Sequence, residues 1–238
     1  MIHARHTPKV LALIPARGGS KSVPMKNLAR VAGAPLIAYT IRAAQGAHIV
    51  DRVVVSTDSQ QIAEVSRELG AEVPFLRPAE LARDDTPGIA PLIHAIKSLD
   101  EQFDWVFLLQ PTSPLRTAAD IEAAWKIANE RDALAVVSVT PAERHPYWAR
   151  RMDEQGRLID FLKAESPITR RQDLPPAFFL NGAIYLARRQ FLVEKQTWYS
   201  DRTYGYVMPA ERSIDIDSPW DLHLVNLILQ GPSSRETP

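Results

Sequence analysis

Short apolar segments alternate with amphipathic segments along the first 140 residues, and this alternation strongly limits how the chain can fold. Apolar runs of four to six residues are typical of buried β-strands, whereas an apolar position at every third or fourth residue indicates an α-helix. Strands separated by helices predict a mostly parallel sheet with helices on both faces. We expect strands at 10–15, 52–56, 73–76, 105–109 and 134–139, and helices at 35–44, 58–69, 89–99 and 118–129.

The alternation stops after Thr140. Residues 141–180 contain five prolines, many charges and one short strand candidate at 158–162, which is not the composition of a core. The regular pattern returns with strand candidates at 183–187 and 213–217, and Ser218, Pro219 and Asp221 form a start signal for a last helix. We therefore expect an α/β domain formed by 1–140 and 181–230, an inserted dimerisation subdomain at 141–180, and a frayed tail at 231–238.

The charges are balanced overall but separated along the chain. Lysine and arginine number 28, as do aspartate and glutamate, yet residues 1–50 hold seven of the basic residues and no carboxylate. The first fifth therefore carries +7 and the remainder −7. A neutral chain has no overall field for nucleic acid or an anionic membrane, so we expect neither partner. No apolar run is long enough for a membrane span, and the absence of cysteine fits a reducing compartment, so a cytoplasmic location is expected.

A basic loop follows the first expected strand. Two glycines, Gly18 and Gly19, allow a tight turn that can aim backbone N–H groups at an anion, and Arg17, Lys21 and Lys26 supply positive charge. The spacing matches neither the P-loop nor the dinucleotide-binding motif. A solvated basic turn is the alternative interpretation, but clustered cations without a carboxylate favour a polyphosphate ligand.

Two aspartates lie two positions apart near the end of the chain. In an extended strand at 213–217, Ile214 and Ile216 would share one face and Asp215 and Asp217 the other. Carboxylate oxygens suit Mg²⁺, which commonly shares its coordination shell with substrate phosphates. The alternative is a half-exposed strand whose Asp217 lies near the start of the last helix. Asp58 is better explained as a helix N-cap than as a site residue.

Six sequence blocks occur in a diagnostic order. They are IPARGGSK (14–21) followed by Lys26 and Asn27, VSTD (55–58), LRPAELA (76–82), LQPTSPLR (109–116), NGAIY (181–185) and SIDID (213–217). Together they resemble the acylneuraminate cytidylyltransferases, also called CMP-sialic acid synthetases, a family that includes legionaminic and pseudaminic acid cytidylyltransferases. The resemblance covers about residues 10–230.

The resemblance implies a Rossmann-like fold of the nucleotide-diphospho-sugar transferase type, a homodimer, and Mg²⁺ or Mn²⁺ as cofactor. The implied reaction joins CTP and a nine-carbon 2-keto sugar acid (a nonulosonic acid) to give a CMP-sugar and pyrophosphate. The implied catalytic residues are Lys26, Arg17 and Lys21; the nucleotide-binding residues are Arg17, Ser20, Lys21, Asn27, Arg77, Asp84 and Gly88; the sugar-binding residues are Gln110, Arg171, Asn181 and Tyr185; the metal ligands are Asp215 and Asp217.

Taken singly, several of these residues have structural interpretations. Arg77 could be a surface charge, Gln110 could satisfy backbone groups beside a proline, Asn181 before a glycine is a turn signal, and Tyr185 could belong to the core. Their occurrence in ordered blocks favours a functional role.

Two positions depart from the sialic acid pattern of the resembled family. Trp148 stands in a region where a lysine is usual, and Phe179 where an arginine is common. Legionaminic or pseudaminic acid therefore becomes a candidate substrate. Trp198 and Tyr199 fall where the family places aromatics near the N-acyl group, although an interface or core role explains them equally well. A nucleotidyltransferase for another keto-acid sugar such as Kdo, or a non-catalytic nucleotide-binding module, are the alternative functions.

Overall fold

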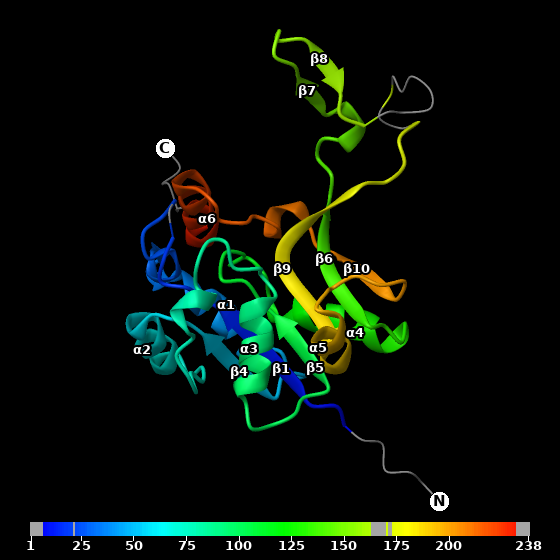
Figure 1. Cartoon of the computed structure of the whole chain (residues 1–238). Helices are drawn as coiled ribbons and strands as arrows, with labels where there is room; N and C mark the ends of the chain where they lie inside the picture. Colours follow the sequence, from blue (N-terminus) through cyan, green and yellow to red (C-terminus); the bar gives the residue numbers. More distant parts are fainter. Residues whose placement is uncertain (1–6, 21, 163–169, 171–172, 232–238) are drawn as a thin grey trace, which may run out of the picture.

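The structure is a computed structural model that describes residues 7–20, 22–162, 170 and 173–231. Its centre is a six-stranded sheet in the order β10-β6-β9-β5-β1-β4 (Figure 1). Strand β1 runs parallel to β4 and β5, β6 runs parallel to β10, and β9 is antiparallel to both β5 and β6. The expected α/β class with a mostly parallel sheet is confirmed. The strands span Val10–Pro15 (β1), Arg52–Ser56 (β4), Trp105–Leu108 (β5), Ala135–Pro141 (β6), Phe178–Arg188 (β9) and Thr203–Val207 (β10).

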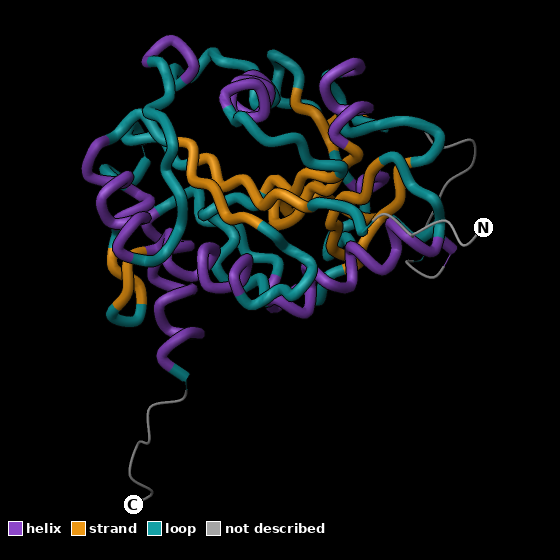
Figure 2. Tube along the Cα trace, turned by 90° about the horizontal axis from the view of Figure 1, so that it is seen from below, coloured by secondary structure: helices purple, strands orange, loops and turns teal. Residues whose placement is uncertain are grey.

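Helices cover both faces of this sheet, which Figure 2 shows edge-on. Successive side chains of β1 alternate between the two faces, so Ala12 and Ile14 join one apolar core while Leu11 and Leu13 join the other. The first core is closed by α1 (Leu36–Gln45), α2 (Gln60–Glu68) and α4 (Ala118–Glu130), and the second by α3 (Ala90–Ser98) and α5 (Arg189–Lys195).

The last helix, α6 (Pro219–Gln230), packs beside the short hairpin of β2 (Arg30–Val31) and β3 (Ala34–Pro35). Val225 of α6, Val31 of β2 and Ile216 form a third, smaller apolar cluster. The expected start signal of α6 is confirmed, because the hydroxyl of Ser218 accepts the backbone N–H of Asp221 and the Asp221 carboxylate accepts that of Ser218.

Three local expectations are wrong. Residues 73–76 form no strand, since Pro74 has no N–H to donate to a ladder; isolated bridges join Glu72 to Val54 of β4 and Leu76 to Thr57. Helix α2 is capped by the Ser59 hydroxyl and not by Asp58, whose carboxylate instead accepts the backbone N–H of Gly18. Residues 213–217, all of which are described, form no strand, because no neighbouring strand runs alongside them.

A narrow arm projects from the body between β6 and β9 (Figure 1). It carries the two-stranded ribbon of β7 (Arg150–Met152) and β8 (Leu158–Asp160), so the strand expected at 158–162 is present but shorter. Strand β6 ends at Pro141 and β9 begins at Phe178, whereas the expected insertion ran from 141 to 180. The sequence pattern missed helix α5 and strand β10.

The chain also contains short 3₁₀ turns, among them those at Lys26–Leu28, Ala79–Leu81, Pro146–Trp148 and Ala210–Arg212. None of the helices in the described part of the chain combines the length and apolar character needed to cross a bilayer. Of the expected frayed tail, residues 232–238 lie outside the described residues.

Candidate active site

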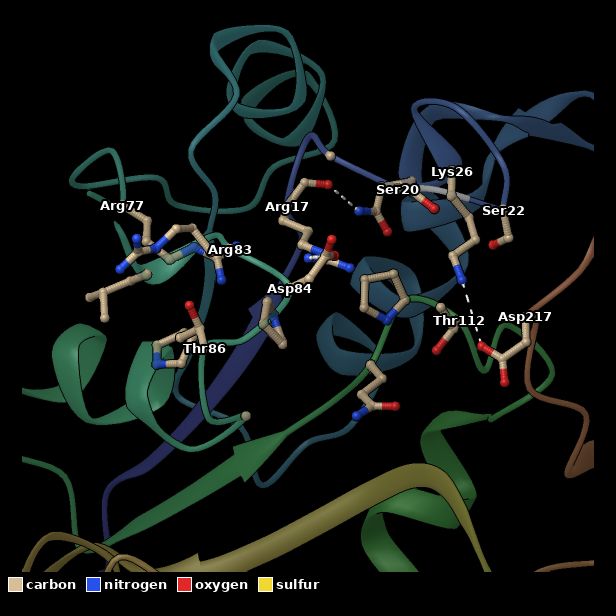
Figure 3. A pocket seen from close by; sticks show the side chains of 18 of the residues that line it. Arg17, Ser20, Ser22, Lys26, Arg77, Arg83, Asp84, Thr86, Thr112 and Asp217 are labelled. Carbon is tan, nitrogen blue, oxygen red and sulfur yellow. Dashed lines mark hydrogen bonds and ion pairs between the residues drawn. The ribbon is translucent and has the colours of Figure 1, made fainter. Parts of the chain in front are cut away.

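A crevice of about 700 Å³ opens where β1 and β5 end (Figure 3). In open α/β sheets the carboxyl ends of parallel strands are where ligands bind. The crevice brings together segments from the two ends of the chain, and its lining includes ten of the residues that the sequence implicated: Arg17, Ser20, Lys26, Asn27, Arg77, Asp84, Gly88, Gln110, Asp215 and Asp217.

The loop after β1 is shaped by contacts that leave little freedom at Gly18. Its N–H donates to the Asp58 carboxylate at 2.9 Å, and a Cβ at this position would lie 3.0 Å from the Ser59 Cβ. On the other side of the loop, the buried Asn27 amide donates to the Arg17 carbonyl at 2.9 Å. The start of the basic loop, at Arg17 and Gly18, is therefore held by its neighbours.

Arg17 reaches across the crevice. Its guanidinium group forms an ion pair with Asp84 at 2.7 Å and donates to the Ala82 carbonyl at 3.4 Å. Ser20, Asp84 and Gly88 also line the crevice. Lys21, the third expected cation of this loop, lies outside the described residues.

Lys26 joins the basic loop to the aspartate segment. Its ammonium group donates to the Ile216 carbonyl at 2.6 Å. It also lies 3.8 Å from Asp217 Oδ1, an ion pair that Figure 3 shows. Only 13% of the Lys26 side chain is exposed, against 82% for Asp217. A cation is thus placed beside two carboxylates at the floor of an open crevice.

Asp215 and Asp217 both line the crevice, although their segment is not a strand. Burial raises the pKa of Asp215, and the charge of Asp217 adds to this effect, while Thr112 and Lys26 oppose it. Asp215 Oδ1 is buried and has no hydrogen-bond partner within the described ranges. A buried carboxylate oxygen without a donor, next to a second carboxylate, suits a hard divalent cation. The described residues contain no group of three or more histidine, cysteine or acidic side chains that could hold a metal, so this site offers a pair of carboxylates.

Arg77 lies at the opposite end of the crevice and is 5% exposed. It donates to the Ser56 carbonyl at 3.0 Å, and its Nε has no partner among the described residues. Burial lowers the pKa of this guanidinium, with Arg17 adding to the effect and Asp58 opposing it. It is therefore not the surface charge that the sequence alone allowed, but a buried donor at the crevice wall.

Gln110 lies where the crevice meets a second cavity of about 340 Å³. Gly182 crosses beneath it with φ +72°, and a Cβ there would approach Gln110 Oε1 to 2.8 Å. The buried Arg116 donates to the carbonyls of Gln110 and Ala183, at 3.2 and 2.7 Å. The Gln110 backbone is thus held by Arg116, and the Gln110 side chain packs closely on Gly182.

Tyr185 lines the second cavity and packs against Trp198, with ring centroids 5.1 Å apart. Burial raises the pKa of Tyr185, and Tyr199 and Asp215 contribute to the increase. The described lining of this cavity has aromatic, apolar and uncharged polar side chains: Ile89, Leu108, Gln110, Tyr185, Gln196, Thr197, Trp198 and Tyr199, together with Gly88.

Asn181 lies beneath the crevice and is almost fully buried. Its carbonyl oxygen accepts the Ser138 hydroxyl at 2.6 Å, and its amide nitrogen donates to Ser213 Oγ at 2.9 Å and contacts Met208 Sδ. These contacts give Asn181 a role in holding the segment that leads to Asp215. Arg171, the remaining expected sugar-binding residue, lies outside the described residues.

Four polar residues that line the crevice were not among the residues predicted from the sequence: Ser22, Arg83, Thr86 and Thr112. Thr112 lies inside the LQPTSPLR block, so the block itself could have indicated it, and its carbonyl accepts the Ile216 N–H at 2.9 Å. Arg83 and Thr86 lie on the loop between Ala82 and Gly88, where no local pattern distinguishes a site residue from a solvated one.

A cationic loop that faces a carboxylate pair across the strand ends defines an α/β enzyme of the nucleotidyltransferase type. The chain belongs to the cytidylyltransferase family, whose sequence model matches residues 11–215. It is 40% identical over 232 residues to the CMP-N,N'-diacetyllegionaminic acid synthase of Legionella pneumophila, covering 93% of this chain and 97% of the relative. The expected family and the expected class of CTP-dependent enzyme are confirmed.

Two further relatives place the chain in the same group. It is 31% identical over 223 residues to the pseudaminic acid cytidylyltransferase of Campylobacter jejuni, covering 92% of this chain and 96% of the relative. It is 34% identical over 231 residues to the N-acylneuraminate cytidylyltransferase of Streptococcus agalactiae, covering 96% of this chain but 55% of that protein. The chain therefore spans about half the length of the streptococcal relative.

The solved structure of a CMP:2-keto-3-deoxy-manno-octonic acid synthetase in complex with CTP has the same fold. The TM-score is 0.70 at 19% identity, with 93% of this chain and 98% of the other covered. A 4-diphosphocytidyl-2C-methyl-D-erythritol synthase from Anaerococcus prevotii gives a TM-score of 0.66 at 14% identity, covering 94% of this chain and 99% of the other. At these identities the likeness shows the fold alone.

Proposed function

We propose that the protein transfers the cytidylyl group of CTP to a nonulosonic acid, forming a CMP-sugar and pyrophosphate. The observation that carries the proposal is the Lys26 ammonium group, which lies 2.6 Å from the Ile216 carbonyl and so brings the basic loop against the aspartate pair. Relatives named as CMP-legionaminic acid synthase, pseudaminic acid cytidylyltransferase and N-acylneuraminate cytidylyltransferase support the same activity.

The nucleotide fits the crevice with its phosphates toward the basic loop. Arg17, Ser20 and Lys21 would hold the triphosphate, and Asn27 would keep the loop in its binding conformation. Arg77 would donate to the cytosine ring, with the loop from Asp84 to Gly88 along the base and ribose. Because Arg17 is paired with Asp84 in this structure, the incoming phosphates would take over that guanidinium group.

Asp215 and Asp217 would hold a Mg²⁺ or Mn²⁺ ion, for which the unpartnered Oδ1 of Asp215 supplies a suitable oxygen. Such an ion neutralises phosphate charge as it develops. Two carboxylates would fill only part of the coordination shell of the ion, so the remaining ligands would come from other oxygens, such as those of a bound nucleotide.

The reaction requires positioning and charge neutralisation more than covalent help from the protein. The anomeric hydroxyl oxygen of the sugar bonds to the α-phosphorus of CTP, and the bond from that phosphorus to the bridging oxygen of pyrophosphate breaks. The hydroxyl proton is lost to solvent, and the bond electrons leave on pyrophosphate. Lys26 is placed to stabilise this leaving charge, which is greater in the transition state than in bound CTP.

The second cavity would hold the acceptor sugar. It shares Gly88, Leu108 and Gln110 with the crevice, so a ligand in it would lie next to the nucleotide. Its aromatic pair of Tyr185 and Trp198 favours the acylamino and deoxy faces of a sugar over a hydroxyl-rich chain. Together with the 40% identity to a legionaminic acid synthase, this favours a legionaminic-type acid.

The proposal also includes a homodimer and a cytoplasmic location. The arm exposes Met152, Leu158 and Phe161, each with at least 67% of its surface accessible, and covering them in a homodimer would remove apolar surface from water. Trp148, two residues before β7, and Phe179, which pairs with Thr140 of β6, are also exposed. A cytoplasmic location would give the enzyme its CTP.

A pyrophosphate-release assay tests the function. The four ribonucleoside triphosphates are crossed with legionaminic, pseudaminic, neuraminic and Kdo acids, with Mg²⁺ present. We expect release only with CTP and a nonulosonic acid, fastest with a legionaminic-type acid. Tight CTP binding without any release would leave a non-catalytic nucleotide-binding module, and preference for Kdo would move the protein to another substrate class.

A further inference from the structure

An ion pair between the buried carboxylate of Asp120 and the partly exposed Arg212 lies outside the crevice, between helix α4 and the start of the aspartate segment. Asp120, which is 1% exposed, accepts two hydrogen bonds from Arg212, at 2.7 and 3.3 Å. The same carboxylate accepts the hydroxyl of Tyr206 at 2.7 Å and, at 2.8 Å each, the backbone N–H and the hydroxyl of Thr117. One buried carboxylate thus joins α4, β10 and the turn that Arg212 ends.

The pair is ionised at neutral pH. Burial acts to raise the pKa of Asp120, but the hydrogen bonds from Arg212, Thr117 and Tyr206 outweigh it, so the pKa is lowered. Burial and the bond to Asp120 raise the pKa of Tyr206 to about 12, so its hydroxyl remains a donor. A charged pair held in this way has one geometry, because both partners form several directed bonds.

The position of Arg212 gives the pair a function beyond capping α4. Arg212 ends the 3₁₀ turn Ala210–Arg212, and the next five residues, 213–217, carry Asp215 and Asp217 without any regular secondary structure. The placement of these aspartates therefore depends on individual anchors, since no strand neighbour fixes them. Beyond Arg212 these anchors include the bond between Ser213 and Asn181 at 2.9 Å and the bond from the Ile216 N–H to the Thr112 carbonyl at 2.9 Å. They also include the Lys26 bond to the Ile216 carbonyl and the Asp217 N–H, which donates to the Asp221 carboxylate at 3.1 Å.

Capping alone does not account for the arrangement. Thr117 and Asp120 complete the capping box of α4 through Asp120 Oδ2, whereas the shortest bond of Arg212 goes to Oδ1. Tyr206 shares Oδ1, but it lies on β10 and is not part of the aspartate segment. Among the described contacts of Asp120, the Arg212 bonds are therefore the ones that hold the segment in place.

We propose that Arg212 is a positioning residue that, through Asp120, fixes the spacing of Asp215 and Asp217 and thereby sets the affinity for the divalent cation. The inference rests on the metal site of the proposed function. Residues that orient metal ligands from outside the coordination shell typically change metal affinity when they are replaced.

The test compares two variants that lose a bond to the same carboxylate. Arg212→Gln removes the anchor of the aspartate segment, while Tyr206→Phe removes a bond to Asp120 Oδ1 and leaves that segment untouched. Mn²⁺ binding to the substrate-free protein is measured from the electron paramagnetic resonance signal of free Mn²⁺, and thermal unfolding is recorded in parallel. We expect Arg212→Gln to weaken Mn²⁺ binding by about 10-fold or more, and Tyr206→Phe by less than about twofold, although both lower the Tm.

Steady-state kinetics give a second measurement. In Arg212→Gln the Mg²⁺ concentration for half-maximal turnover should rise by about 10-fold, whereas KM for CTP at saturating Mg²⁺ stays close to that of the wild type. Arg212→Lys keeps the charge but not the forked geometry, so its Mg²⁺ requirement should lie between those of the wild type and Arg212→Gln. It replaces Arg212→Gln in the test if that variant does not fold.

The possible outcomes separate the inference from the function it rests on. Equal Mn²⁺ affinities in the wild type and the Arg212 variants, with a lowered Tm, would show that the pair only stabilises the fold and would overturn the inference. Equal losses of affinity in Arg212→Gln and Tyr206→Phe would also overturn it. If the wild type bound no Mn²⁺ and turned over without divalent cation, the metal site itself would be wrong and the inference would fall with it.

Discussion

The Lys26 ammonium group lies 2.6 Å from the carbonyl oxygen of Ile216, a residue 190 positions further along the chain, and 3.8 Å from Asp217 Oδ1. The contact joins the basic first fifth of the sequence to the acidic remainder. A chain of zero net charge therefore has a crevice lined by both cations and carboxylates. An anionic nucleotide and its counter-cation can be held there at the same time.

Replacing Lys26 should slow the reaction more than it weakens CTP binding. In Lys26→Ala we expect kcat to fall by about 10²–10³-fold, the cost of losing one preorganised donor to a developing anion. The dissociation constant for CTP, measured by calorimetry without acceptor, should change by less than about fivefold, because Arg17 and Lys21 remain. Lys97→Ala, at an exposed position on α3, is the control. Equal losses in kcat and in CTP affinity would show that Lys26 serves binding only.

Asp215 should lower the stability of the metal-free protein. Its pKa is raised by burial, so the folded state favours the protonated form and loses stability as pH rises through that pKa. In Asp215→Asn, without divalent cation at pH 7.5, we expect the Tm to rise by about 2 °C or more, the shift that about 1 kcal/mol produces in a chain of this size. Activity should be lost, and the Tm advantage should shrink as the pH falls below the raised pKa of Asp215, because the wild-type side chain is then neutral as well.

Asp217 provides the matched comparison, because 82% of its side chain is exposed. Asp217→Asn should lose activity without any gain in Tm. A rise in Tm equal to that of Asp215→Asn would mean that general relief of negative charge, and not the burial of Asp215, is the cause. Full activity of either variant at limiting Mg²⁺ would contradict the assignment of the two aspartates as metal ligands.

The sequence predicted the strand and helix pattern well where local signals and tertiary contacts agree. β1 is apolar on both faces because two helix layers cover it, and Ser218 with Asp221 caps α6 through bonds within four residues. The predictions failed where a residue far away in the sequence determines which contacts a side chain makes. Asp58 has the local character of an N-cap, but the Gly18 N–H takes its carboxylate, and Ser59 caps α2 instead.

In the candidate site, too, local sequence signals indicated some residues, whereas residues held by distant partners were not predicted. The blocks that carry Arg17, Lys26, Arg77 and the aspartates could be found from their order in the sequence, and the structure brings these residues to one crevice. The support beneath them could not be found, because Arg212 pairs with a carboxylate 92 positions away and no local pattern indicates it. Asn181 shows the limit of assigning roles from blocks, since its side chain bonds to Ser138 and Ser213 beneath the crevice.

Gly182 should not tolerate a side chain. Its φ of +72° is unfavourable for other residues, and a Cβ would lie 2.8 Å from Gln110 Oε1. In Gly182→Ala we expect a loss of about 1–3 kcal/mol in the free energy of unfolding, together with a raised KM for the sugar acid because Gln110 is displaced. Gly205→Ala is the control, since a Cβ there meets Val139 Cγ2 at an ordinary 3.5 Å. An unchanged KM for the sugar in Gly182→Ala would show that the Gln110 contact does not matter for the acceptor.

Arg77 should determine the choice of base. Its guanidinium group is buried, donates to the Ser56 carbonyl at 3.0 Å, and keeps an unpartnered Nε among the described residues. Cytosine presents its ring nitrogen and carbonyl oxygen as acceptors, whereas uracil presents a ring N–H that would face the same donors. Leaving such groups unpaired costs about 1–3 kcal/mol, so in Arg77→Gln we expect the ratio of kcat/KM for CTP to that for UTP to fall by about 10-fold or more. Arg77→Lys should also lose discrimination, because an ammonium group cannot reproduce the fork.

Arg42→Gln, at an exposed position on α1, controls for loss of charge. A ratio that stays at the wild-type value in both Arg77 variants would place base recognition elsewhere, with the backbone of the loop between Asp84 and Gly88 as the next group to test.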